Sequence, residues 1–205
     1  MTRKTLASTS ACAVMLLMAG CGGGVLYPKY YDLEIPPAPR PALSWKRLPV
    51  TVAVRRFETL PYLRQGRIVY RQSPGEIAFY EYHRWAVDPA VTVTTAMIDS
   101  LRSSRLFSFV KPYDGHDQQE YLMTGRLERL DEIDYEGGVQ VEAKLSAELV
   151  NPRTGATLWT GGAAETLRLD TRNVNSVIME MSCAVQKSID RLVESLDQQL
   201  AANEP

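Results

Sequence analysis

The segment Val139-Gln-Val-Glu-Ala-Lys-Leu-Ser-Ala-Glu-Leu149 alternates strictly between apolar and polar residues. Side chains of a β-strand point to alternate faces of the sheet, so this pattern predicts a strand with one buried face and one face in water. Such a sheet buries its apolar face beneath a second layer of structure. The segment therefore predicts a two-layer fold that is built on a β-sheet.

Segments on both sides of this strand predict the other strands of an antiparallel meander. Residues that are typical of turns, chiefly Gly, Asp and Pro, separate these segments. The predicted strands are residues 121–133, 157–159 and 163–169, with turns at 134–138 and 152–155. In the first of them the apolar spacing shifts between Leu127 and Leu130, which predicts a β-bulge near residues 128–129.

The N-terminal half predicts shorter strands, which are marked by β-branched and aromatic residues. A cluster of prolines from Pro36 to Pro41 forbids helix and ends the first of these strands. The turn Ser73-Pro-Gly75 favours pairing of the two strands that flank it. The predicted strands are residues 30–35, 49–57, 67–71, 76–82 and 106–113.

Two helices complete the predicted elements. Asp88 is a favourable N-cap, Pro89 suits the first helical position, and an apolar stripe follows as far as Ser104. A second stripe, with steps of three and four residues, predicts a helix over residues 173–200. Because each helix has one apolar side, we expect both helices to pack on the same face of the sheet.

These elements predict an α/β fold: a two-layer sandwich with a mixed, mostly antiparallel sheet and two helices packed on one face. The chain has 205 residues, of which 45% are apolar and 23% are charged, a composition that supports an ordinary globular core. We predict a single domain over residues 30–200, followed by a tail over residues 201–205.

The N-terminus predicts an export signal that is followed by a lipid anchor. Arg3 and Lys4 precede an apolar stretch from Leu6 to Met18, which is too short to cross a bilayer. Two small residues then precede Cys21, and this pattern resembles the lipobox of bacterial lipoproteins. The resemblance implies cleavage before Cys21 and attachment of acyl chains, palmitate among them, to that residue. The alternative is an ordinary cleaved signal that happens to contain a cysteine.

We accordingly predict a signal peptide over residues 1–20 and a lipidated tether over residues 21–29. Gly22 stands where Asp would resemble a signal for retention in the inner membrane, so the pattern resembles sorting to the outer membrane. Loss of Arg3 and Lys4 would change the formal net charge from −1 to −3, which argues against nucleic-acid binding. Cys183 would be the one cysteine left besides Cys21, so no intramolecular disulfide is expected.

The search for catalytic residues and metal ligands finds little. Two histidines are present, His83 at the end of a predicted strand and His116 in a polar loop. A zinc site would need several His, Cys or carboxylate ligands at recognisable spacing, and a phosphate-binding loop or a nucleophile elbow would need its own glycine pattern. Cys183 has no histidine near it in the sequence. We therefore predict no catalytic residue, no metal site and no cofactor.

Segment 76–85 is dense in aromatic and charged residues, and it offers a candidate surface for a partner protein. Aromatic residues and arginine are frequent anchors of interfaces, so we select Tyr82, Arg84 and Trp85 as candidate contacts. The alternative interpretation is that the aromatic side chains pack the sheet and that the arginines neutralise Glu76 and Glu81.

Several segments together resemble one protein family, the auxiliary lipoproteins of ABC-type transport systems. The resemblance covers about residues 30–195, and the order and number of the segments carry it. These segments are Tyr30-Tyr-Asp-Leu33, Pro61-Tyr-Leu-Arg64, Ile68-Val-Tyr-Arg71, Glu76-Ile-Ala-Phe-Tyr-Glu-Tyr-His-Arg-Trp-Ala86, Leu122-Met-Thr-Gly-Arg-Leu-Glu-Arg-Leu130, and Thr154-Gly155 with Trp159.

The resemblance implies an α/β fold without catalysis, anchored in the outer membrane of a Gram-negative bacterium and facing the periplasm. The implied partners are a periplasmic protein with MCE domains and an inner-membrane ABC transporter, which together transport lipid between membranes. Assembly into a homo-oligomeric ring is compatible with the same resemblance. Cys21 is the residue whose role, lipidation, carries over from the family.

Two other functions remain open at the level of the sequence. A lipoprotein of this kind could be an assembly factor for another envelope complex, such as the one that exports lipopolysaccharide. It could also be a periplasmic hydrolase or a small-molecule carrier, in which His83 or His116 acts beside carboxylates.

Overall fold

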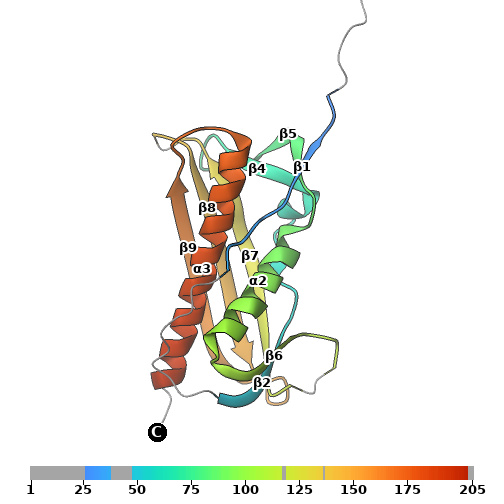
Figure 1. The fold of residues 1–205 in the computed structure, drawn as a ribbon, viewed down its shortest axis with the longest axis vertical. Helices are drawn as coiled ribbons and strands as arrows, with labels where there is room; N and C mark the ends of the chain where they lie inside the picture. Colours follow the sequence, from blue (N-terminus) through green and yellow to red (C-terminus); the bar gives the residue numbers. More distant parts are fainter. Residues whose placement is uncertain (1–25, 38–47, 117–118, 136, 203–205) are drawn as a thin grey trace, which may run out of the picture.

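A mixed β-sheet and two α-helices form the described part of the chain (Figure 1). The structure is a computed structural model, and it describes residues 26–37, 48–116, 119–135 and 137–202. The strands are β1 (Lys29–Tyr31), β2 (Leu48–Val54), β3 (Glu58–Thr59), β4 (Arg67–Arg71), β5 (Ala78–Trp85), β6 (Phe107–Pro112), β7 (Tyr121–Ile133), β8 (Gln140–Val150) and β9 (Thr157–Arg168). The helices are α2 (Pro89–Ser104), α3 (Val174–Ala202) and a short 3₁₀-helix at Leu63–Gln65.

Strand β7 holds the sheet together because both of its edges are paired. Along one edge it pairs antiparallel with β8 over nearly its whole length, and β8 pairs in turn with β9. Along the other edge β2, β3 and β4 pair in parallel with successive parts of β7. Strand β6 extends the sheet from β2, while β5 and then β1 extend it from β4. The sheet is mixed and its longest ladders are antiparallel, as the sequence predicts.

The meander of β7, β8 and β9 confirms one detail of the prediction and corrects another. The register between β7 and β8 shifts between Leu127 and Arg129, so the predicted bulge is present. Segments 157–159 and 163–169 were expected to be separate strands, but β9 runs through Gly161 and Gly162 without a break. A Cβ atom at Gly161 would lie 2.2 Å from the ring of Trp159, so this glycine makes room for the indole within the strand.

Both helices lie on one face of the sheet, as expected (Figure 1). Helix α2 begins as predicted, because the Asp88 carboxylate accepts a hydrogen bond from the backbone N–H of Ala90 at 2.9 Å. At the start of α3, the Asn173 side-chain oxygen accepts a hydrogen bond from the backbone N–H of Ser176, also at 2.9 Å. The two caps fix the points at which the chain enters the helical layer.

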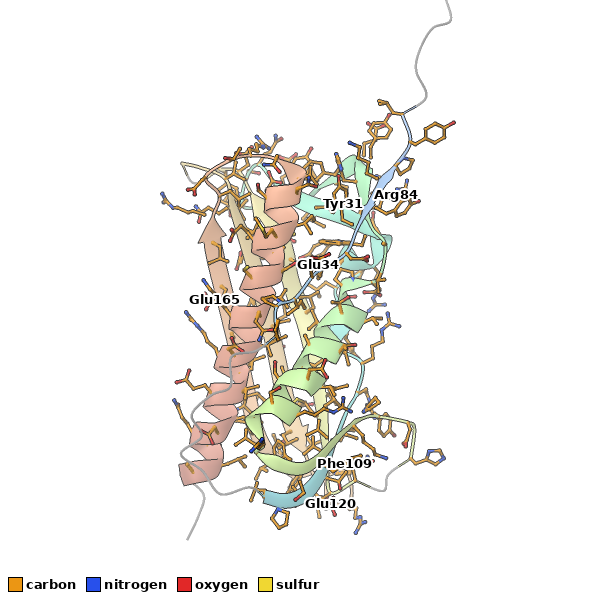
Figure 2. All side chains as sticks on the ribbon, viewed as in Figure 1. Tyr31, Glu34, Arg84, Phe109, Glu120 and Glu165 are labelled. Carbon is orange, nitrogen blue, oxygen red and sulfur yellow. The ribbon has the colours of Figure 1, made fainter. Side chains whose placement is uncertain are left out.

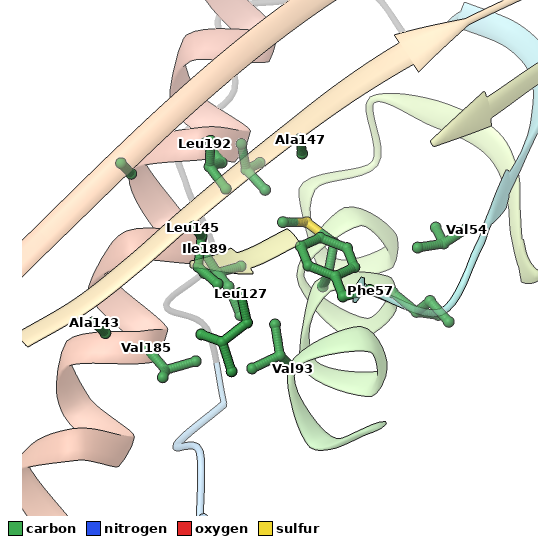
Figure 3. Packing of buried hydrophobic residues seen from close by; sticks show 14 of the residues in the cluster. Val54, Phe57, Val93, Leu127, Ala143, Leu145, Ala147, Val185, Ile189 and Leu192 are labelled. Atoms are coloured by element: carbon green, nitrogen blue, oxygen red, sulfur yellow. The ribbon is translucent and has the colours of Figure 1, made fainter. Parts of the chain in front are cut away.

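The hydrophobic core fills the space between the sheet and the helices (Figure 3). At its centre the ring of Phe57 lies against β7, and a Cβ atom at Gly125 would be only 2.3 Å from that ring. The backbone N–H of Phe57 also donates to Thr94 Oγ1 of α2 at 2.9 Å. Leu127 and Val93 belong to the same buried cluster. Because Gly125 has no side chain, the ring of Phe57 can pack directly between the sheet and α2.

The residues that follow β1 leave the sheet and run over the helical layer, as Figure 1 shows. A strand was predicted over residues 30–35, but β1 ends at Tyr31. The next apolar residue, Leu33, is buried, and Ile35 packs against the hydrophobic cluster. Residues 35–37 line a surface pocket together with Ala96 of α2 and Gln186 of α3, so the chain passes between the two helices. Burial of Leu33 in the helical layer explains why the strand is shorter than predicted.

Candidate functional site

The candidate surface of segment 76–85 lies where β1 joins β5 at one edge of the sheet. Strand β1 runs parallel to β5, with Tyr30 beside Arg84 and Tyr31 beside Trp85. Strand β4 pairs with β5 from the other side and places Arg67 beside Arg84. Figure 2 shows Tyr31 and Arg84 near the end of the domain at which the described chain begins.

Trp85 is part of the core, which corrects its selection as a surface residue. It is 6% exposed and belongs to the main hydrophobic cluster. Its backbone is fixed on both sides, because Trp85 lies beside Tyr31 of β1 and its N–H donates a hydrogen bond to the carbonyl oxygen of Gly66. Tyr82 and Arg84 are half-buried, so parts of both side chains reach the surface. Among the described residues, no group forms a hydrogen bond with the buried Nε of Arg84.

The side chains of Tyr31 and Tyr80 lie next to the imidazole of His83. The hydroxyl oxygen of Tyr31 lies 2.8 Å from Nδ1 of His83, and the ring of Tyr80 meets the imidazole edge-on at 5.4 Å. Burial, with a smaller contribution from the positive charge of Lys29, lowers the pKa of His83 below its ordinary value. The geometry therefore favours a neutral imidazole that joins β1 to β5.

His116 does not complete a catalytic pair with His83. It lies in the loop after β6, which is at the opposite end of the domain from β5 (Figure 1). Its side chain is 75% exposed, and its Nδ1 lies 3.5 Å from the carboxylate of Asp114. The hydrogen bond from Lys111 is the largest of the effects that lower the pKa of Asp114, to about 2. The two histidines thus have separate, local environments.

A buried ion pair that the sequence analysis missed lies on the sheet beside this surface. Asp131 of β7 is fully buried, and Arg71 of β4 donates a hydrogen bond from Nε to its carboxylate at 2.5 Å. The Tyr62 hydroxyl lies 3.4 Å from the other carboxylate oxygen of Asp131. Burial, followed by the charge of Asp131, raises the pKa of Tyr62 to about 12. Arg129 extends the network to Glu142 of β8 through a hydrogen bond of 2.6 Å.

Glu132, the neighbour of Asp131, is buried among different groups. The Tyr80 hydroxyl donates to its carboxylate at 2.6 Å, and Arg172, which precedes α3, lies 3.3 Å from the other oxygen. Burial and the bond to Glu132 raise the pKa of Tyr80. Adjacent side chains of a strand point to opposite faces, so two consecutive acidic residues within a strand indicate that at least one is turned inward. That signal could have identified this pair of networks.

These polar clusters act as structural connections between elements. Asp131 joins β7 to β4, while Glu132 joins β7 to β5 and to the segment before α3. Among the described residues, no group of three or more His, Cys, Asp or Glu side chains is arranged to hold a metal ion. Cys183 is a half-buried free thiol in α3, and Cys21 lies outside the described residues. Within the described part, neither helix has the length and apolar character that crossing a membrane requires.

A comparison with known protein families shows which family the chain belongs to. Residues 31–202 match the family described as the ABC-type transport auxiliary lipoprotein component. The chain belongs to this family. The match begins at the last residue of β1 and includes both α-helices and the whole meander, so it spans most of the chain and confirms the resemblance that the sequence indicates.

Solved structures share the fold at low sequence identity. A protein from Xanthomonas campestris has a TM-score of 0.73 and 15% identity, covering 86% of this chain and 99% of that one. A hypothetical protein from Chlamydia trachomatis has a TM-score of 0.51 and 12% identity, covering 76% of this chain and 100% of that one. At these identities the similarity concerns the fold alone. No curated protein matches the sequence.

Proposed function

We propose that this protein is a non-enzymatic adaptor of an ABC transport system that moves lipid between the two membranes of a Gram-negative envelope. The family match over residues 31–202 is the observation that carries this proposal. In the proposal, acylated Cys21 holds the domain on the periplasmic face of the outer membrane. A periplasmic MCE-domain protein and the inner-membrane ABC transporter are its partners.

The placement of the polar residues supports a role in binding and not in catalysis. The buried carboxylates Asp131 and Glu132 are engaged by Arg71, Tyr80 and Arg172, which connect separate strands. His83 is held by Tyr31 and is remote from His116. An adaptor needs a stable scaffold with an accessible surface, and these interactions stabilise such a scaffold.

Lipid anchoring gives the adaptor its mechanism. A domain that is confined near a membrane meets a partner at a high effective concentration, so contacts that are weak in solution suffice for assembly. Tyr82 and Arg84 are both half-buried and partly accessible, and Tyr82 is kept as the proposed contact with the partner protein from segment 76–85. Trp85 is left out because it is buried in the core.

A complementation experiment tests the role of the anchor. We expect deletion of the gene to impair lipid homeostasis of the envelope, and we expect the Cys21→Ala variant to restore little of it. A matched control replaces Cys183 by Ala, because this thiol is half-buried in α3 and has no part in anchoring. Full complementation by an exported but unanchored Cys21→Ala protein would contradict the proposed mechanism.

The proposal also includes assembly into a homo-oligomeric ring. Light scattering of the lipidated protein in detergent measures its mass directly. A defined multimer is the expected result, and a monomer over the whole range of accessible concentrations would remove the ring from the proposal.

A further inference from the structure

Exposed apolar and aromatic side chains gather at the end of the domain where the described chain begins. Leu26, Tyr27 and Tyr30 are 68%, 77% and 62% exposed. Leu26 follows Cys21 by five positions, and a fully extended chain of that length spans at most about 18 Å. Acylation of Cys21 would therefore hold this end of the domain close to the bilayer.

Three cationic side chains of this region form no ion pair with the described residues. Lys29 is exposed, and sheet register places Arg67 and Arg84 side by side on β4 and β5. Within the described ranges, none of the ion pairs involves Lys29, Arg67 or Arg84. Adjacent like charges across a sheet are unfavourable without a counter-ion, so this site is suited to an anionic partner.

We infer that this tether-end patch, formed by Leu26, Tyr27, Lys29, Tyr30, Arg67 and Arg84, rests on the surface of an anionic phospholipid bilayer. Tyrosine places its ring among acyl chains and its hydroxyl among headgroups, and it is enriched at membrane interfaces for this reason. Lysine and arginine are attracted to the negative surface of anionic lipids. The inference rests on the anchor at Cys21 in the proposed function and adds side-chain contacts that fix the orientation of the domain.

The pairing that fixes Lys29 and Tyr30 on the sheet makes this orientation specific. Strand β1 pairs with β5, and the residues after it are held over the helices by burial of Leu33. Figure 2 shows Phe109 and Glu120 at the opposite end of the domain from Tyr31 and Arg84. A domain that rests on its tether end therefore directs Phe109, which is 58% exposed, away from the membrane.

Spin-label accessibility tests the inference on the full lipidated protein. The protein is reconstituted into vesicles of phosphatidylethanolamine and phosphatidylglycerol, in a Cys183→Ser background. A nitroxide is attached at Tyr27→Cys or Tyr30→Cys, and at Phe109→Cys as the matched exposed control. Accessibility to oxygen and to a water-soluble nickel complex reports whether each label lies in the lipid interface or in water.

Labels at positions 27 and 30 should be several-fold less accessible to the nickel complex than the label at position 109. Vesicles of phosphatidylcholine alone should reduce this protection, because they offer no net negative charge to Lys29, Arg67 and Arg84. Full water exposure of all three labels on acylated protein would overturn the inference while leaving the anchor intact. Mass spectrometry of the same sample that finds no acyl chain on Cys21 would overturn both the anchor and the inference.

Discussion

At the scale of single residues, Gly125 controls how closely the sheet and α2 can approach. A Cβ atom at this position would lie 2.3 Å from the ring of Phe57, which is itself buried and held by Thr94. Gly125→Ala should therefore lower the free energy of unfolding by about 1–3 kcal/mol through overpacking. Chemical denaturation measures this change.

A matched glycine in the same sheet provides the control for Gly125. At Gly162 of β9 the nearest atom to an added Cβ is the backbone oxygen of Leu145, at 3.9 Å. Gly162→Ala should leave stability unchanged or raise it by less than about 1 kcal/mol, because it reduces the entropy of the unfolded chain. Equal losses in the two variants would show that backbone propensity, and not Phe57, explains the result.

Substitution of Asp131 tests whether the buried ion pair stabilises the fold. Asp131→Ala would leave the buried Arg71 guanidinium without its carboxylate partner, and breaking such a pair costs about 3–5 kcal/mol of stability. The control is Glu58→Ala, which removes an exposed pair with Arg126 and should have little effect. Denaturation that gives similar midpoints for both variants would contradict the structural role of Asp131.

His83 should make the stability of the domain depend on pH. Burial and Lys29 lower its pKa in the folded state below the ordinary value of 6.5, so the unfolded chain takes up the proton at higher pH than the folded chain does. Stability is therefore lost as the pH falls through about 6.5, and the loss is complete below the lowered pKa.

Thermal melting from pH 8 to pH 5 measures this effect. His83→Gln should flatten the decrease in Tm, whereas the exposed His116→Gln should keep the profile of the parent protein. The same slope in all three proteins would exclude His83 as the titrating group.

At the scale of elements, burial of Leu33 should be the main interaction that holds residues 32–37 against the helices. Leu33 is buried while Glu34 is exposed, so Leu33→Ala should release residues 29–37 from the helical layer and Glu34→Ala should not. Truncation of a buried leucine typically costs about 2–5 kcal/mol. Hydrogen exchange should then be faster at the amides of β1 and unchanged in β7 and β8.

The accuracy of sequence-based prediction varies among the elements for physical reasons. Strand β7, its bulge and helix α2 were predictable because local periodicity, spacing and capping residues define them. The sequence predicts two strands where the structure has the single strand β9. The reason is that Gly161 makes room for Trp159, a contact that exists only in the folded chain. The parallel pairing of β2, β3 and β4 with β7 depends on contacts between distant segments, which local patterns do not contain.

The candidate surface illustrates the same limit. Aromatic density in residues 76–85 indicated a contact site, but side chains alternate along β5, so Trp85 points to the opposite face from Tyr82 and Arg84. As a result Trp85 lies in the core, while Tyr82 and Arg84 are partly accessible. The basic pair of Arg67 and Arg84 was not predictable, because β4 and β5 bring together two residues that are 17 positions apart.

At the scale of the whole molecule, the family fold is joined to a proposed anchor and a proposed orientation. The family match establishes the domain as an ABC-type transport auxiliary lipoprotein component. With Cys21 acylated as proposed, the short distance in sequence from Cys21 to β1 would place the tether end beside the membrane and the far end at Phe109 away from it.

Recovery of the lipidated protein from crosslinked membranes, with its partners identified by mass spectrometry, tests the proposed adaptor function. The account predicts enrichment of an MCE-domain protein or of its ABC transporter, relative to membranes that contain the Cys21→Ala variant. Recovery of lipopolysaccharide-export proteins, or of no transport protein at all, would contradict it.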